Sequence, residues 1–155
     1  APMGKFCASC ADAQAIGIAN TGFQIFDAPA FAFGLAYIGG VGARLKAFQI
    51  LNGRMSARWV AISVHAFGYP GTSPAISSNG NVDRIVWALD VSGYGNHAPA
   101  VLHAYGYNLA GLYNSAAAGS RDAAGPAVKF TVPTVANGKV YVGTQTELDV
   151  YGLLP

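Results

Sequence analysis

The sequence predicts an all-β fold of the β-propeller type, made of blade-like four-stranded antiparallel sheets, with about three repeats that form a partial propeller. Two observations lead to this prediction. Segments that begin with proline recur along the chain, and short apolar runs are separated by turn residues. In addition, 52% of the residues are hydrophobic and only 10% are charged, as expected for a packed domain of short strands and tight turns.

The repeat is clearest in two segments, PAFAFGLAYIGG from Pro29 and PTVANGKVYVGT from Pro133. A looser copy begins at Pro74 and continues into IVWALD. The intervals between the prolines are close to the roughly 40–50 residues of a propeller blade. When the two clear segments are aligned on their prolines, three further positions coincide: Gly34 with Gly138, Tyr37 with Tyr141, and Gly39 with Gly143.

Each repeat can be interpreted as a small antiparallel sheet. The proline would open a strand at a position where no backbone N–H is needed. Asn79-Gly80 and Asn137-Gly138 would form tight hairpin turns, because both residue types accept positive φ. We expect the apolar positions of the following strands to form the blade core: Tyr37, Ile38, Leu45, Ile85, Val140, Val142, Leu148 and Val150.

The chain therefore divides into two parts. Residues 1–28 form an N-terminal segment with no readable pattern, and residues 29–155 form the repeat region, with an insertion at 91–126. Within this insertion, Ala100–Tyr105 alternates as a strand does. Leu109–Ala118 is compatible with a short helix or a turn, and Ser115–Gly125 is expected to be an exposed loop.

Charge and hydropathy exclude two classes of partner. The net charge is +2 and the basic residues are scattered, without the stripe or patch typical of nucleic-acid binding. No apolar run reaches the roughly 18 residues that a membrane span needs. We therefore expect no nucleic-acid partner and no membrane span.

Several motifs resemble the C-terminal part of propellers with pyrroloquinoline-quinone-like repeats, of the secreted bacterial type. They are FGYPGTSPAISSNG from Phe67, IVWALD from Ile85, APAVLHAY from Ala98 and, most specifically, VKFTVPTVANGKVYVGTQTELDVYGLL from Val128. The resemblance implies a propeller fold and a secreted or periplasmic location. It does not imply a bound quinone, because many members of the family bind no cofactor. Two departures from the family pattern, Asp83-Arg84-Ile85 and Gly106-Tyr107, fall at expected turns.

His97 and His103 are the candidates for metal ligands. On one continuous strand their spacing would place them on the same face. A metal would need a third ligand, for which Asp90 and His65 are the candidates, and Pro99 would interrupt a regular strand between the two histidines. Because the ligand set is incomplete, we expect ordinary hydrogen bonds and no metal site.

Other chemical motifs lack the context that they need. Cys7 and Cys10 are not followed by the histidine of a haem-attachment motif, so a local disulfide or free thiols are expected. Gly71-Thr72-Ser73-Pro74 loosely resembles a nucleophile elbow, but a strand and not a helix is expected after it. Trp87 is expected to pack within a blade.

The sequence thus favours a non-catalytic propeller module that acts as a scaffold or binding domain of a secreted or periplasmic protein. Its catalytic and cofactor-binding residues are unknown, no cofactor is expected, and a protein or carbohydrate partner is compatible with it. The alternative is the C-terminal fragment of an alcohol or sugar dehydrogenase that depends on pyrroloquinoline quinone and calcium. An open arc of about three blades also predicts either self-association or a longer parent chain, because it would leave strand edges bare.

Overall fold

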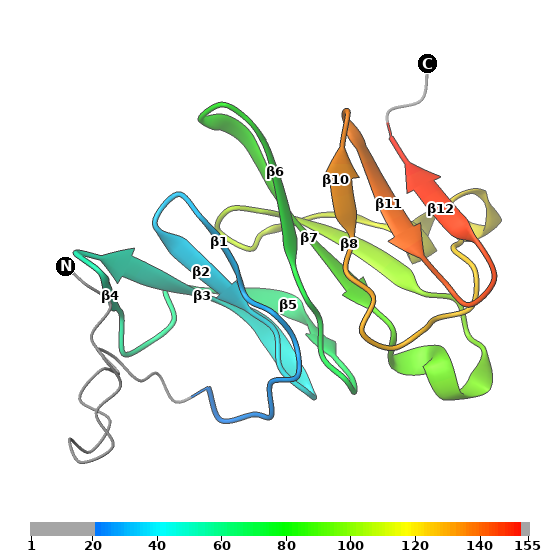
Figure 1. The fold of residues 1–155 in the computed structure, drawn as a ribbon, viewed down its shortest axis with the longest axis horizontal. Helices are drawn as coiled ribbons and strands as arrows, with labels where there is room; N and C mark the ends of the chain where they lie inside the picture. The colour runs from blue at the N-terminus through cyan, green and yellow to red at the C-terminus, as the bar shows by residue number, and fades with distance from the viewer. Residues whose placement is uncertain (1–20, 153–155) are drawn as a thin grey trace, which may run out of the picture.

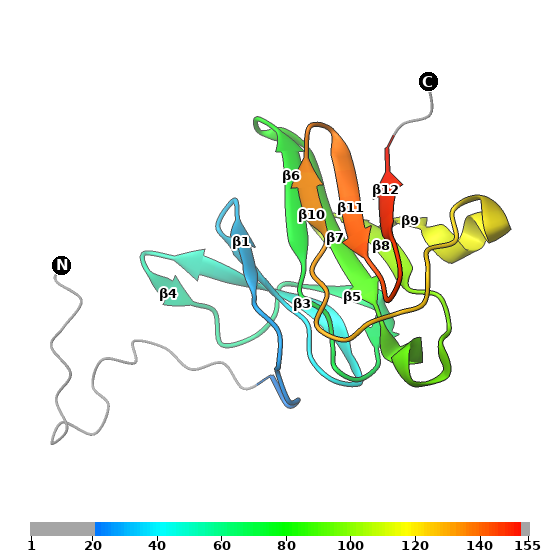
Figure 2. The same ribbon diagram turned by 45° about the vertical axis from the view of Figure 1, so that its right-hand side comes forward.

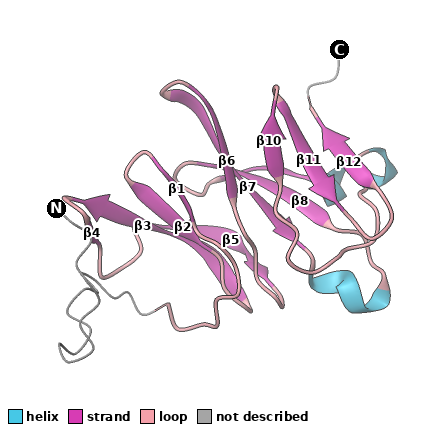
Figure 3. Ribbon diagram, viewed as in Figure 1, coloured by secondary structure: helices cyan, strands magenta, loops and turns pink. Residues whose placement is uncertain are grey.

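A computed structural model describes residues 21–152, and these residues form three antiparallel sheets joined by short turns and two 3-10 helices (Figures 1 and 3). The predicted all-β class is confirmed. Cys7 and Cys10 lie outside the described residues, as does most of the segment 1–28. No helix among residues 21–152 is long and apolar enough to cross a membrane.

The first sheet has five strands. Strands β1 (Ala30–Ala32), β2 (Leu35–Ile38), β3 (Ala43–Leu51) and β4 (Arg54–Met55) follow one another, and β5 (Ala61–Phe67) pairs with β3. The third sheet contains β10 (Thr134–Ala136), β11 (Lys139–Gly143) and β12 (Leu148–Tyr151). Only the second sheet therefore has the four strands expected of every repeat.

The second sheet consists of β6 (Ala75–Asn79), β7 (Val82–Asp90), β8 (Val101–Gly106) and β9 (Gly111–Asn114). The two 3-10 helices, η1 (Ser92–Asn96) and η2 (Ser115–Arg121), flank its last two strands. The segment 91–126, interpreted from sequence as an insertion, thus supplies half of this sheet. The alternating run Ala100–Tyr105 predicted the strand that the structure shows as β8. The segment Ser115–Gly125, expected to be an exposed loop, begins with η2, in which Ser115 is buried.

The three prolines that define the repeats stand directly before the first strand of each sheet. Pro29 precedes β1, Pro74 precedes β6 and Pro133 precedes β10. The expected hairpin at Asn137-Gly138 is confirmed, because φ is 51° and 71° at these residues and Ala136 pairs with Lys139. At the other expected turn, Asn79 is still in β6 and pairs with Val82, so the turn lies one residue later.

The second sheet lies between the other two and buries both of its faces (Figures 1 and 2). One core cluster joins it to the first sheet and includes Tyr37, Leu45, Val86 and Ala88. The other joins it to the third sheet and includes Leu89, Leu102, Val140 and Val142. Along β7, Val86 and Ala88 point one way while Trp87 and Leu89 point the other, as the period of two in a strand requires.

Part of the predicted core is correct and part is wrong. Tyr37, Leu45, Val140 and Val142 are buried, whereas Ile38 and Ile85 are only half-buried. The prediction failed for β12, where Leu148 and Val150 are 63% and 51% exposed. Asp149 and Tyr151 face inward instead: Asp149 accepts a hydrogen bond from Gly125 N, and the Tyr151 hydroxyl donates to Asp122 O.

Candidate functional site

A pocket of about 970 Å³ opens between the edge of the first sheet and the last strands of the second. Val64, His65 and Ala66 of β5 form one wall. His103 and Tyr105 of β8 line the pocket from the second sheet, and the rest of the lining comes from Gly111–Asn114 of β9 and from η2. The pocket lies where two sheets meet, which is a common position for ligand sites.

Strand periodicity brings the polar residues of this pocket together. On β5, Ser63, His65 and Phe67 share the face that meets the second sheet, and the alternate residue Val64 is 82% exposed. On β8, Tyr105 packs into the cluster shared with the first sheet and the His103 ring stacks on His65 of β5, whereas Leu102 packs into the cluster shared with the third sheet. Asp90 follows Val86 and Ala88 on the same face of β7, and Ala88 pairs with His103.

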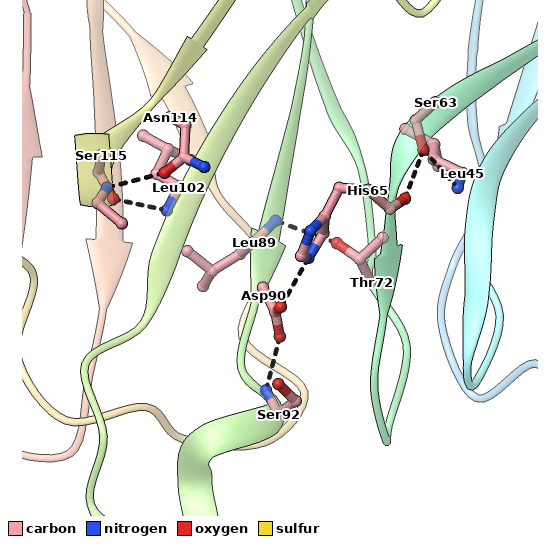
Figure 4. A network of polar contacts seen from close by, with 11 residues as sticks. Leu45, Ser63, His65, Thr72, Leu89, Asp90, Ser92, Leu102, Asn114 and Ser115 are labelled. Carbon is pink, nitrogen blue, oxygen red and sulfur yellow. Dashed lines mark hydrogen bonds and ion pairs between the residues drawn. The ribbon is translucent and has the colours of Figure 1, made fainter. Parts of the chain in front are cut away.

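A bulge in β5 aims His65 at the second sheet. Arg44 pairs with Ala66 and Lys46 with Ile62, so that Ser63, Val64 and His65 together oppose Leu45 alone. The Ser63 hydroxyl replaces backbone hydrogen bonds that are missing at the bulge. It accepts from Leu45 N at 3.0 Å and donates to His65 O at 2.8 Å (Figure 4). Bulges of this kind redirect side chains next to functional sites.

His65, Asp90 and His103 form the polar centre of the site. His65 Nε2 lies 2.7 Å from Asp90 Oδ2, and the other carboxylate oxygen accepts from Ser92 N at 2.9 Å (Figure 4). The His65 and His103 rings stack with centroids 4.3 Å apart. One ligand atom from each of the three side chains lies within 4.8 Å of the other two, and among the described residues no other group of three or more His, Cys, Asp or Glu side chains is so close.

The protonation states follow from burial and hydrogen bonding. Burial, followed by the neighbouring His65, lowers the pKa of His103 to about 4, so its imidazole is neutral at physiological pH. Burial alone would raise the pKa of Asp90, but hydrogen bonds from Ser92 and His65 outweigh it, so that pKa is lowered and the carboxylate is ionised. Burial raises the pKa of Tyr105 to about 12 and keeps its phenol neutral.

A second polar group lines the far side of the pocket. The Tyr113 hydroxyl donates to Asp122 Oδ2 at 2.6 Å, and Arg121 binds both oxygens of that carboxylate at 2.7 and 3.0 Å. The hydrogen bond from Arg121, and then that from Tyr113, lower the pKa of Asp122 to about 2. Arg121 is thus already paired, and its charge is largely cancelled on the pocket wall.

The structure separates the two histidines that the sequence analysis considered together. His97 follows η1 with φ of 58°, and its exposed ring makes a hydrogen bond with Gln145 through Nδ1 at 3.0 Å. His103 instead meets the residues that the sequence analysis named as possible third ligands, Asp90 and His65. The sequence signal that could have placed His65 in the site is the alternation in β5. Ser63, His65 and Phe67 are two residues apart and share the inward face, and Val64 points outward.

The other motifs are structural. The Thr72 hydroxyl accepts from Leu89 N and Ser73 donates to Asp27, while β6 begins directly after Pro74, as expected for a turn before a strand. Trp87 donates from Nε1 to the Ser77 hydroxyl at 2.9 Å and packs against the core between the second and third sheets.

No protein-family model, curated protein or solved structure matches this chain.

Proposed function

We propose that this chain is a non-catalytic binding module made of three consecutive propeller-type blades, with its ligand site in the pocket between the first two. The observation that carries the proposal is a repeated mode of stacking. In each sheet, the residue directly after the proline pairs with an aromatic residue: Ala30 with Tyr37, Ala75 with Trp87, and Thr134 with Tyr141.

This aromatic position has the same role in successive sheets. Tyr37 of the first sheet packs into the cluster shared with the second, and Trp87 of the second sheet packs against the cluster shared with the third. Tyr141 lies between the buried Val140 and Val142 and therefore faces away from the second sheet. Equivalent positions that always face the next sheet are what radial stacking of blades requires.

The pocket supports a binding role. Its aromatic side chains, Tyr105 and Tyr113, stand next to hydrogen-bonding groups on Asn114 and the histidines. A wall that combines aromatic faces with polar groups suits a ligand that has both apolar and hydroxyl-bearing faces, and we take a carbohydrate as the ligand class. A secreted or periplasmic location remains part of this proposal, on the resemblance of the repeat motifs.

Saturation-transfer NMR with a panel of soluble mono- and oligosaccharides tests the binding role. We expect a signal from at least one sugar, its loss in Ala117→Trp, which fills the pocket, and its retention in Ala136→Trp, at an exposed position of β10. The sugar panel is run in the presence of a chelator. The absence of binding to every sugar, or dye-linked alcohol oxidation after addition of pyrroloquinoline quinone and calcium, would overturn the proposal.

A further inference from the structure

His103 carries a buried nitrogen without a partner. Its side chain belongs to a residue that is 5% exposed, and Nε2 makes no hydrogen bond. Buried polar atoms nearly always have a partner, and an unpaired one in a native structure calls for an explanation such as an ion. The same histidine belongs to the cluster with His65 and Asp90, in which one ligand atom of each residue lies within 4.8 Å of the other two.

The spacing of the three side chains is close to that of a coordination shell. Bonds of about 2.0–2.1 Å in a tetrahedral zinc site place neighbouring ligand atoms about 3.3 Å apart. On binding an ion, His65 Nε2 and Asp90 Oδ2, now 2.7 Å apart, would separate by a few tenths of an ångström. The ligand atom of His103, within 4.8 Å of the other two, would move closer to them. The His65 side chain is 38% exposed and so has room to turn, whereas Asp90 is held by Ser92 N.

Charge and access also suit a cation. Two imidazoles and one carboxylate give a nitrogen and oxygen ligand set that favours first-row divalent ions. Among the described residues that line the pocket, Arg121 is the one Lys or Arg side chain, and it is paired with Asp122. Because His65 and His103 both line the pocket, a fourth position at the ion would be open to it.

A catalytic histidine–aspartate pair fits the same residues less well. His65 uses Nε2 for Asp90, and the nearby Ser63 hydroxyl is committed to the main chain of Leu45 and His65. The Tyr105 side chain is buried, and burial keeps its phenol neutral. No nucleophile among these groups is aligned on the imidazole.

We propose that His65, Asp90 and His103 form a binding site for one divalent transition-metal ion of the zinc type, with a coordination position open to the pocket. This inference goes beyond the proposed sugar-binding role and does not depend on it. Metal binding is measured with the ion alone, and sugar binding is measured with a chelator present, so either proposal can fail without the other.

The test is calorimetric titration of the chelator-treated full chain with ZnCl2. The background is the double variant Cys7→Ser and Cys10→Ser, because thiolates are zinc ligands in their own right. We expect binding of one ion per chain. Asp90→Asn and His65→Gln should each weaken it by about tenfold or more, since even residues that only orient ligands have effects of this size.

His97→Ala is the matched control, since it removes an exposed histidine outside the cluster. Its affinity should equal that of the background. Cobalt absorption and zinc X-ray absorption, recorded on the same background, should report two imidazoles in the shell. Circular dichroism checks that every variant is folded.

Several outcomes of the titration and the spectroscopy would overturn the site. They are an absence of binding by the folded background, an unchanged affinity in folded Asp90→Asn and His65→Gln, and a shell without imidazole. A loss of binding in His97→Ala equal to that in His65→Gln would likewise assign the ion to scattered surface histidines. His65→Gln changes a half-exposed side chain, so its fold should persist even where that of Asp90→Asn does not.

Discussion

Trp87 in the second sheet occupies the register of Tyr37 in the first, since each pairs with the alanine that follows a strand-opening proline. Both side chains pack toward the next sheet along the chain. The relationship explains why the chain can repeat a sheet without repeating a sequence closely. A large aromatic ring at this register covers the face of the next sheet, whichever aromatic it is.

The inward and outward faces of the third sheet can be distinguished by a pair of substitutions. Val142→Asp should destabilise the fold by several kcal/mol, because Val142 is fully buried and the new carboxylate would have no partner. Val150→Asp, at an exposed position of the next strand, should change the melting temperature little. Equal losses in thermal denaturation of the two variants would show that the assigned faces are wrong.

Local signals in the sequence were sufficient for the strand starts and for one hairpin. Proline lacks an N–H and Asn-Gly accepts positive φ, so Pro29, Pro74, Pro133 and the turn at Asn137-Gly138 carry their structural meaning in a few residues. The face of β12 was not predictable in this way. Its apolar residues Leu148 and Val150 suggest a core, but the inward face is decided by distant partners of its other residues.

The candidate site was predicted only in part, because it too depends on contacts between residues distant in the sequence. All three residues of the cluster are candidates from the sequence, yet their spacing suggests a pair of His97 and His103 on one continuous strand. The 3-10 helix η1 and the left-handed conformation at His97 break that continuity. The approach of β5 to β8 is a contact between sheets, and it depends on the bulge at Ser63, which no local pattern announces.

The Ser63 hydroxyl should contribute measurably to stability. Ser63→Ala leaves the buried Leu45 N–H without its acceptor, and we expect a loss of about 1–3 kcal/mol in the free energy of unfolding. Ser56 is a close control: its hydroxyl also accepts from a strand N–H, that of Gln49, and donates to a carbonyl two residues on, but in an exposed place. Urea denaturation of Ser56→Ala should show a clearly smaller loss, because water can replace the hydroxyl there. A loss as large as that of Ser63→Ala would contradict this account.

Asp27 should make stability depend on pH. One carboxylate oxygen is buried without a partner, and burial raises the pKa of this group above 3.8, although the hydrogen bond from Ser73 lowers it in part. The folded state therefore holds its proton more tightly than the unfolded state, and stability is lost as the pH rises from 3.8 through the folded pKa.

Asp27→Asn removes this titration. Its melting temperature should exceed that of the wild type at pH 7, and the difference should shrink as the pH falls toward 4. Differential scanning calorimetry across that range is the measurement. A difference of opposite sign, or one that does not change with pH, would show that Asp27 is not the cause.

The last prediction concerns the outer face of the third sheet. Tyr141 pairs with Val150 and Gly143 with Leu148, so these side chains share the face that, in the first and second sheets, packs on the next sheet. Leu148 and Val150 are more than half exposed, and an apolar sheet face of this kind favours association. We expect the purified chain to self-associate at micromolar concentration in size-exclusion chromatography with light scattering. Val150→Lys should shift it toward the monomer, because the charge would have to be buried at the contact, whereas Val64→Lys, at an exposed position of β5 in the first sheet, should shift it less. A wild-type chain that remains monomeric at high concentration would show that this face is stable in water and that the stacking ends with the third sheet.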